Sequence, residues 1–418
     1  MHPDFSRISV IGLGYIGLPT AAMFASRKIG VIGIDINAET VATINRGEIH
    51  IVEPDLDLAV RTAVQAGYLR ASQKAEPAQA FLIAVPTPFQ DEHQPDLSYI
   101  EAAARTIAPV LQPGNLIVLE STSPVGATEH LAGLLASERP DLTFPATHGE
   151  SSDIRVAHCP ERVLPGKVMQ ELVHNNRIIG GLTPRCSAMA EALYKTFVQG
   201  ECVTTDVRTA EMAKLAENSF RDVNIGFANE LSIICDRLDI DVWELIALAN
   251  RHPRVNILSP GPGVGGHCIA VDPWFIITRS PDEARLIRTA REVNDSKPQW
   301  VIDKVIAALA NLCAANPTRV ASEFVIACYG LAFKPDIDDL RESPALEIAR
   351  QLESIHDGPL LLVEPHVNHV PNGFLKAELV DIDWAYAEAD LHLMLVDHTL
   401  FRQRGAPSGV IIDTKGIW

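Results

Sequence analysis

Short apolar runs alternate with helical patterns over the first 200 residues, and this alternation limits the fold more than any other feature of the chain. The runs typical of buried parallel strands are Ile8–Ile11, Val31–Asp35, Phe81–Val85 and Leu116–Glu120, and further strand candidates at Arg155–His158 and Arg177–Gly180 extend the sheet. Helices are expected between them, at Tyr15–Lys28 and Val125–Glu138. Strands that alternate with helices form βαβ units, so this part of the chain predicts a doubly wound sheet.

The middle of the chain has a different pattern. Arg208–Asp236 contains no proline and one glycine, and its apolar residues recur every three or four positions, which predicts a long helix. Further helices are expected at Val242–Asn250, Pro281–Asn294 and Trp300–Ala314, with a glycine- and proline-rich loop at Ser259–His267. After residue 317 the strand-like runs return, at Phe324–Tyr329, Leu360–Val363, Leu391–Val396 and Val410–Asp413, with a helix at Pro344–Ser354.

The predicted fold class is therefore α/β, with two Rossmann-like doubly wound domains joined by an all-helical connector that contains a long central helix. We expect a cofactor domain at residues 1–205, the connector at 206–315 and a second Rossmann-like domain at 316–418. At 418 residues the chain is too long for one hydrophobic core, which agrees with this division.

Charge and composition exclude several classes of protein. The net charge of −18 argues against a nucleic-acid partner, because such partners require clustered lysine and arginine. No apolar run approaches the roughly 18 residues that would predict membrane insertion. The first residues lack the features of a signal peptide, so a cytoplasmic location is expected. Seven cysteines without a C-x-x-C pair indicate neither a disulfide framework nor a zinc site, and no metal is predicted.

A glycine-rich turn directly follows the first predicted strand. Gly12, Gly14 and Gly17, with Tyr15 and Ile16 between them, form the G-x-G-x-x-G pattern that brings a pyrophosphate to a helix N-terminus. Asp35 ends the next strand 18 residues after Gly17, where a carboxylate binds a ribose hydroxyl and repels a 2′-phosphate. NAD is thus favoured over NADP, although Asp35 could instead be a solvated carboxylate.

Two threonines follow later strands of the same predicted sheet. Thr87 and Thr122 lie beyond the carboxyl ends of their strands, where ligands of open α/β sheets bind. Each is expected to point into the cofactor crevice, or else to serve only as a turn or cap residue.

A cysteine follows the densest glycine cluster of the chain. Cys268 comes after four glycines within six residues, and a helix that begins near Asp272 would lower the pKa of its thiol. Lys214 and Asn218 are spaced i, i+4 and therefore share one face of the long helix, where they are either a catalytic pair or an exposed polar pair.

The sequence resembles the UDP-glucose/GDP-mannose dehydrogenase family along essentially its whole length. The matching blocks are Gly12–Gly17, Ser121–Gly126, Pro160–Arg162, Glu211–Asn218, Gly265–Cys268, Gly330–Pro335 and Asp338–Pro344. The resemblance implies two successive hydride transfers to NAD, with the aldehyde trapped on Cys268 as a thiohemiacetal and then oxidised to a thioester. Sulfur suits both steps, because a thiolate is a good nucleophile and its acyl product hydrolyses readily.

The resemblance also assigns roles at this site. Lys214 and Asn218 would stabilise the oxyanions, Thr122 would assist catalysis, and either Glu161 or Asp272 would activate the hydrolytic water. The family members that act on UDP-glucose carry a second glutamate where this chain has Pro165, so the choice between the two carboxylates stays open.

The remaining implied ligands are charged or lie in the matching blocks. Thr128 and Arg341 would contact the cofactor. The implied substrate ligands are Arg162, Val163, Lys214, Asn218, Arg221, His252, Arg254, Gly265, Phe333, Lys334 and Lys415. Outside such blocks, a single arginine is usually a solvated surface charge.

Within the family, His267 and Val271 resemble the branch that acts on N-acetylated sugars. This implies oxidation of UDP-N-acetyl-D-mannosamine at C6 to the uronate, for a bacterial surface polysaccharide similar to enterobacterial common antigen. A homodimer packed through the helix at Arg208–Asp236 is implied, with Arg254 reaching the neighbouring subunit's site. The alternative is that this helix is buried between the two Rossmann-like domains of one subunit.

Three alternatives stay open for the activity. The first is another UDP-sugar substrate: UDP-GlcNAc, UDP-GalNAc or UDP-glucose. The second is a β-hydroxyacid dehydrogenase, which has no use for Cys268 or a second Rossmann-like domain. The third is a catalytically silent nucleotide-sugar binding protein.

Overall fold

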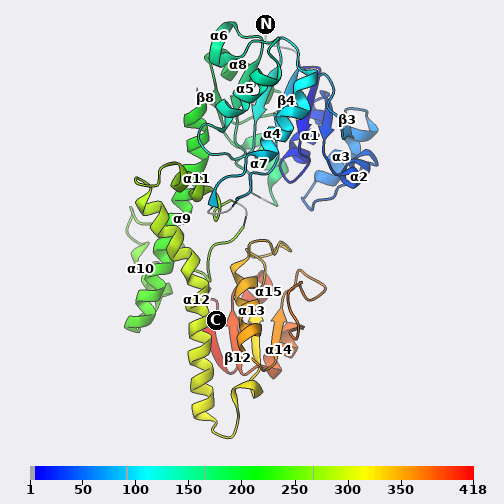
Figure 1. Cartoon of the computed structure of the whole chain (residues 1–418). Coiled ribbons are helices and arrows are strands. Elements are labelled where there is room, and N and C mark those ends of the chain that lie inside the picture. Colours follow the sequence, from blue (N-terminus) through cyan, green and yellow to red (C-terminus); the bar gives the residue numbers. More distant parts are fainter. Residues whose placement is uncertain (1–4, 91–92, 165, 267) are drawn as a thin grey trace. The chain divides into compact units, whose positions relative to one another are not determined.

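The computed structural model describes residues 5–90, 93–164, 166–266 and 268–418 (Figure 1). The chain divides into two compact units. The first contains the residues up to Glu217 together with Trp274–Arg279, and the second contains Asn218–Pro273 and Ser280–Trp418. Pro165 and His267, which the sequence analysis singled out, lie outside the described residues.

The first unit is built on an eight-stranded sheet with the strand order β3-β2-β1-β4-β5-β6-β7-β8. Its strands are β1 (Arg7–Ile11), β2 (Gly30–Ile34), β3 (Leu69–Ser72), β4 (Ala80–Ile83), β5 (Leu116–Leu119), β6 (Arg155–His158), β7 (Arg177–Gly181) and β8 (Cys202–Asp206). All neighbouring pairs are parallel except β6 and β7.

Helices cover both faces of this sheet, because successive strand residues point to opposite sides. In β4, Ala80 and Leu82 join one buried cluster, whereas Phe81 and Ile83 join the other. The helices are α1 (Gly17–Ser26), α2 (Ala38–Asn45), α3 (Leu56–Gln65), α4 (Ser98–Ile107), α5 (Ala127–Glu138), α6 (Pro145–His148), α7 (Val168–His174) and α8 (Pro184–Tyr194), with 3₁₀ turns at Ala108–Val110 and Gly149–Ser151.

Long helices dominate the middle of the chain (Figure 1). They are α9 (Val207–Leu238) and α12 (Arg285–Ala315), and the shorter helices α10 (Val242–Ala249) and α11 (Asp272–Arg279) lie between them in the sequence. The prediction of separate helices at Pro281–Asn294 and Trp300–Ala314 was wrong, because α12 continues through Pro298. Asn294 and Lys297 are buried beside this proline, and their packing outweighs its usual cost in a helix.

The second unit contains a parallel five-stranded sheet with the order β11-β10-β9-β12-β13. Its strands are β9 (Ile326–Tyr329), β10 (Leu360–Val363), β11 (Glu378–Leu379), β12 (Leu391–Met394) and β13 (Val410–Asp413). The helices after α12 are α13 (Pro344–Ile355), α14 (Ile382–Glu388) and α15 (Thr399–Arg402), with a 3₁₀ turn at Ala321–Glu323. The two doubly wound sheets and the helical middle confirm the predicted fold class.

Two further features bear on the class of protein. Throughout the part of the chain that the structure describes, every helix is too short or too polar to cross a membrane. None of the seven cysteines, all of which are described, is in a disulfide.

Candidate active site

The three glycines of the turn after β1 have different surroundings. Gly12 has a φ of +88°, and a Cβ there would lie 2.7 Å from the Ala84 carbonyl oxygen. A Cβ on Gly17 would overlap the Gly12 carbonyl oxygen, whereas one on Gly14 would meet nothing within 4 Å in the described chain. The protein's own packing therefore requires Gly12 and Gly17, while Gly14 leaves open space before α1. A pyrophosphate fits such a space, because helix N-termini attract anions.

Asp35 follows β2 and holds this turn in place. Its Oδ2 accepts a hydrogen bond from the Leu13 amide at 3.0 Å, and its Oδ1 accepts one from the Asn37 amide at 2.9 Å. The carboxylate is half-buried at the carboxyl end of the strand, where a ribose hydroxyl is expected. Tyr15 is 40% exposed in the same turn, and Ile16 directly precedes α1.

The loops after β4 and β5 are tied to each other. The Thr87 hydroxyl donates to the Thr122 carbonyl oxygen at 2.6 Å, and the Ser121 hydroxyl donates to the Val85 carbonyl oxygen at 2.6 Å. Thr87 and Thr122 are both half-buried. The two predicted threonines thus lie together beyond the carboxyl ends of neighbouring strands.

The N-terminus of α5 is capped by a carboxylate from α9. Glu211 is fully buried and accepts hydrogen bonds from the Gly126 amide, the Thr128 amide and the Thr128 hydroxyl at 2.7–2.8 Å. Burial raises the pKa of Glu211, and these hydrogen bonds oppose that effect. Thr128 therefore has a partner inside the protein, and its contact with the cofactor stays a prediction.

Glu161 is buried, and both of its carboxylate oxygens have partners. Oε1 accepts the Arg162 amide at 2.7 Å, and Oε2 accepts Arg177 Nη1 at 2.7 Å. Arg177 is itself only 3% exposed. The Arg162 guanidinium pairs with Glu217 at 2.6 Å, and Val163 packs against the hydrophobic core.

A second buried carboxylate lies in the same cluster. Glu120 accepts a hydrogen bond from the Tyr194 hydroxyl at 2.5 Å, and the Arg177 guanidinium lies 5.1 Å from the centre of the Tyr194 ring. Burial raises the pKa of Glu120 to about 7 and that of the Cys159 thiol to about 12. Cys159 is therefore protonated at neutral pH and is no competitor for the role of nucleophile.

Helix α9 carries Lys214, Asn218 and Arg221 along successive turns. The first two are half-buried and Arg221 is exposed. Asn218 Nδ2 donates to Asp272 Oδ2 at 2.5 Å, and Asp272, the first residue of α11, is 3% exposed. This bond links two predicted catalytic residues that are 54 positions apart.

The glycines before Cys268 fit closely against loops of the C-terminal sheet. A Cβ on Gly265 would overlap the Glu342 carbonyl oxygen, and one on Gly266, which has a φ of +84°, would lie 2.9 Å from the Phe333 ring. The Gly266 amide donates to the Glu342 carbonyl oxygen at 3.3 Å. Cys268 follows with its side chain exposed. Its carbonyl oxygen accepts the Asp272 amide at 2.8 Å, so the cysteine directly precedes α11.

The loop with Phe333 and Lys334 is held at both ends by one buried pair. Glu364 accepts the Leu331 and Ala332 amides at 2.7 and 3.1 Å and pairs with His398 Nε2 at 3.0 Å. His398 Nδ1 accepts the Asp336 amide at 2.9 Å. Burial alone would raise the pKa of Glu364, but its bond with His398 and the amide bonds hold that pKa below its usual range.

The other predicted cationic ligands lie in the second unit. Arg341 pairs with Asp339 at 2.7 Å, and Lys415 Nζ lies 3.4 Å from Asp397. A Cβ on Gly261 would lie 3.5 Å from Lys415 Nζ, so Lys415 lies beside the Cys268 loop. His252 and Arg254 follow α10 and are exposed.

Each unit thus gathers a different part of the predicted site. The first holds the glycine turn, Asp35, Thr87, Thr122, Thr128, Glu161, Arg162, Val163 and Lys214. The second holds Asn218, Arg221, His252, Arg254, Gly265, Cys268, Asp272, Phe333, Lys334, Arg341 and Lys415. The residues that the sequence analysis missed are buried charged side chains behind these groups, namely Glu120, Arg177, Glu211, Glu364 and His398.

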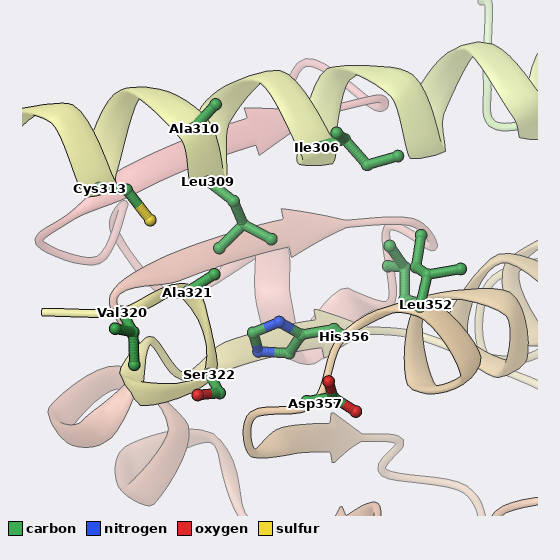
Figure 2. A pocket seen from close by; sticks show the side chains of 11 residues that line it. Ile306, Leu309, Ala310, Cys313, Val320, Ala321, Ser322, Leu352, His356 and Asp357 are labelled. Carbon is green, nitrogen blue, oxygen red and sulfur yellow. The ribbon is translucent and has the colours of Figure 1, made fainter.

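Two pockets of the second unit lie outside the predicted ligand set. One, of about 580 Å³, is lined by Leu309 and Cys313 of α12, by Val320 and by His356 (Figure 2). The other, of about 280 Å³, borders the Cys268 loop at Val264. Neither contains a charged cluster suited to a pyrophosphate.

A group of possible metal ligands lies near the Phe333 loop. It consists of Asp336, His366 and His398. Both ring nitrogens of His398 already have partners, namely the Asp336 amide and Glu364. We therefore assign no ion to this group.

Comparison with known proteins gives matches over the whole chain. The UDP-glucose/GDP-mannose dehydrogenase family matches in three segments: its NAD binding domain at residues 6–198, its central domain at 208–296 and its UDP binding domain at 327–418.

Two similar relatives have names that specify different sugars. A UDP-N-acetyl-D-mannosamine dehydrogenase of Yersinia pestis is 63% identical over 99% of this chain and 100% of its own length. An NDP-N-acetyl-D-galactosaminuronic acid dehydrogenase of Ralstonia nicotianae is 62% identical over 99% and 97%. Among solved structures, the UDP-D-ManNAc dehydrogenase of Pyrococcus horikoshii has a TM-score of 0.86 at 38% identity, covering 99% of this chain and 96% of that one.

Proposed function

The chain belongs to the UDP-glucose/GDP-mannose dehydrogenase family, and we propose that it oxidises UDP-N-acetyl-D-mannosamine at C6 to the uronate. It is an NAD-dependent UDP-sugar dehydrogenase, which excludes the alternatives of a β-hydroxyacid dehydrogenase and a catalytically silent binding protein. We further propose that the product serves a bacterial surface polysaccharide similar to enterobacterial common antigen. A cytoplasmic location belongs to the same proposal, because nucleotide sugars and NAD are cytoplasmic metabolites.

The observation that carries the catalytic part of this proposal is the packing of the Cys268 loop. Gly265 and Gly266 fit against Glu342 and Phe333, where a side chain at either position would collide. This packing leaves Cys268 exposed next to Asp272, which is bonded to Asn218. A structural cysteine would need neither the glycines nor the exposure.

The cofactor site fits NAD in its shape and charge. The open space at Gly14 suits a pyrophosphate, and the Asp35 carboxylate suits a ribose diol and disfavours a 2′-phosphate. When bound, NAD accepts a hydride from C6 of the sugar in each of the two oxidations.

The protein's own residues would do the remaining chemistry. Lys214 and Asn218 would hold the C6 oxygen as its proton leaves, since an ammonium and an amide both stabilise an oxyanion. Cys268 would then form a carbon–sulfur bond with the aldehyde, and the second oxidation would leave a thioester. Water would displace the thiol and give the carboxylate, with Asp272 or Glu161 taking its proton.

Exposed apolar residues on α9 support a homodimer. Phe220, Phe227, Ile234 and Leu238 are 72%, 51%, 45% and 61% exposed. Their spacing of seven, seven and four residues puts them on one face of the helix, as in helices that pack against a partner helix. We propose that a second copy of the chain covers this face and that Arg254 enters the partner's site.

The identity of the sugar can be tested by comparing substrates. We expect kcat/KM to be highest for UDP-ManNAc among UDP-ManNAc, UDP-GlcNAc, UDP-GalNAc and UDP-glucose. The Ralstonia relative supports a second candidate, a nucleotide-linked N-acetylgalactosamine derivative. A higher kcat/KM with UDP-GalNAc would establish that candidate and overturn the proposal.

A further inference from the structure

Four polar side chains are buried where α9 and α12 pack together. Asp222 and Asn229 come from α9, and Arg291 and Asn294 come from α12. Each is at most 1% exposed. Helix pairs usually fill such positions with apolar side chains, so this group requires an explanation.

The four side chains form one continuous chain of hydrogen bonds. Arg291 Nη1 donates to Asp222 Oδ1 at 2.6 Å, and Asn294 Nδ2 donates to the same oxygen at 2.8 Å. Asn229 Nδ2 in turn donates to Asn294 Oδ1 at 2.8 Å.

Each end of this hydrogen-bond chain contacts the backbone of the Cys268 loop. Asn229 Oδ1 accepts the Gly261 amide at 2.9 Å, at the start of the glycine cluster. Arg291 Nη1 lies 3.5 Å from the carbonyl oxygen of Ile269, the residue after Cys268. One hydrogen-bonded group therefore contacts the loop on both sides of the cysteine.

Stability alone does not account for this group. Replacing buried ion pairs with apolar residues is often neutral or stabilising. Within the described chain, Asp222 Oδ2 and Arg291 Nε have no hydrogen-bond partner, so the desolvation cost is only partly recovered. The four side chains instead fix the relative positions of the groups that they contact, because a fully buried hydrogen-bond network has few alternative arrangements.

We propose that Asp222, Asn229, Arg291 and Asn294 are positioning residues that hold the Cys268 thiol at the distance required to capture the aldehyde. This inference rests on the proposed thioester function of Cys268. The first oxidation needs no thiol, because the alcohol loses a hydride and a proton to give the aldehyde. A displaced loop should therefore spare the first step and impair the second. The aldehyde would then escape as its hydrate, and NADH per sugar would fall from two toward one.

The test compares Asn229→Ala with Ser232→Ala. Ser232 is buried in the same helix interface, where its hydroxyl accepts Lys297 Nζ at 2.5 Å and donates to the Asn229 backbone carbonyl oxygen at 2.6 Å. No described bond joins the Ser232 side chain to the Cys268 loop or to the side chain of Asn229. We expect similar losses of Tm in both variants. Asn229→Ala should lower the rate of uronate formation by about 10- to 100-fold, yield fewer than two NADH per sugar and release an aldehyde that a hydrazine traps. It should also change the rate at which iodoacetamide alkylates the Cys268 peptide, whereas Ser232→Ala should keep the wild-type values.

Two outcomes would overturn the inference: two NADH per sugar at the wild-type rate from Asn229→Ala, or the same loss from Ser232→Ala. If Asn229→Ala does not fold, Arg291→Lys takes its place, because it keeps a positive charge opposite Asp222. Other results would show that the proposed thioester function itself is wrong. In that case the wild type would yield one NADH per sugar, or Cys268→Ala would still form uronate.

Discussion

Asp35 contacts the backbone of its own turn and is also the expected ligand of the ribose. Its carboxylate braces the backbone at Leu13 and Asn37, and its charge faces the expected ribose site. Asp35→Asn keeps one of the two acceptor oxygens, so it loses the charge together with one of the two backbone hydrogen bonds. We expect KM for NAD to rise about 5- to 150-fold, because losing a charge-assisted hydrogen bond costs about 1–3 kcal/mol, and discrimination against NADP to relax.

Steady-state kinetics with both cofactors would measure this effect. Asp96→Asn is a suitable control, because Asp96 also accepts a local amide bond, from Ser98, but lies outside the predicted cofactor ligands. Unchanged KM values for both cofactors in Asp35→Asn would remove Asp35 from the ribose site.

The raised pKa of Glu120 should make the free energy of unfolding depend on pH. Its pKa is raised to about 7 in the folded chain by burial, whereas an unfolded glutamate titrates near 4.5. Between these values the folded state binds more protons than the unfolded state. Glu120 therefore contributes full stability below about pH 4.5, and this contribution is lost as pH rises through about 7, by about 3 kcal/mol in total.

Glu120→Gln removes this titration and keeps an acceptor for the Tyr194 hydroxyl. We expect the Tm of the wild type, relative to that of the variant, to fall between pH 4.5 and 7.5. Calorimetry across this range measures the difference. Parallel pH curves for the two proteins would show that Glu120 titrates normally.

The site residues that could be predicted from the sequence are those whose partners lie close to them along the chain. Gly12, Gly17 and Asp35 form one turn, so their spacing is itself the signal. Glu211 caps α5 from 83 positions away, and Arg177 reaches Glu161 across a strand pair. In the sequence alone, a buried carboxylate or guanidinium cannot be distinguished from a surface charge, because its partner is remote in the chain and is identified only in the folded structure.

At the scale of elements, the glycine turn offers a matched pair of variants. A Cβ on Gly17 would overlap backbone, whereas one on Gly14 would enter open space. We expect Gly17→Ala to cost about 1–3 kcal/mol of unfolding free energy, because the collision is with a carbonyl oxygen that cannot move freely. Gly14→Ala should keep the wild-type Tm and raise KM for NAD about tenfold by blocking the pyrophosphate. Equal losses of Tm in both variants would contradict this account of the turn.

The elements that the sequence missed have weak apolar signals. β3 alternates buried and exposed residues over only four positions, and β8 is mostly exposed, so neither shows the apolar run that marked the central strands. The prediction also divided α12 at Pro298, because local rules end a helix near a proline. Only the packing of α12 against α9 reveals that it continues.

At the scale of the whole molecule, the apolar face of α9 predicts a dimer that Phe227→Asp should weaken. A buried charge in a helix–helix contact costs several kcal/mol, so sedimentation should detect monomers. Leu375→Asp is the control, since Leu375 is 92% exposed and lies outside α9. A wild-type protein that is monomeric and fully active would exclude the shared site.

Hybrid dimers test whether Arg254 crosses the interface. Neither Arg254→Ala nor Cys268→Ala should be active alone. Mixed dimers contain one site with both an intact Cys268 and the partner's intact Arg254, so mixing the variants should restore part of the activity. No recovery from verified hybrids would place Arg254 in its own subunit's site.

The most direct test of the central claim is the amount of NADH formed per UDP-ManNAc consumed, with the sugar limiting and NAD in excess. A four-electron oxidation through a thioester on Cys268 predicts two NADH and one uronate per sugar. It also predicts no uronate from Cys268→Ala, although that variant should still bind NAD. One NADH per sugar from the wild type, or a normal yield of uronate from Cys268→Ala, would contradict the account.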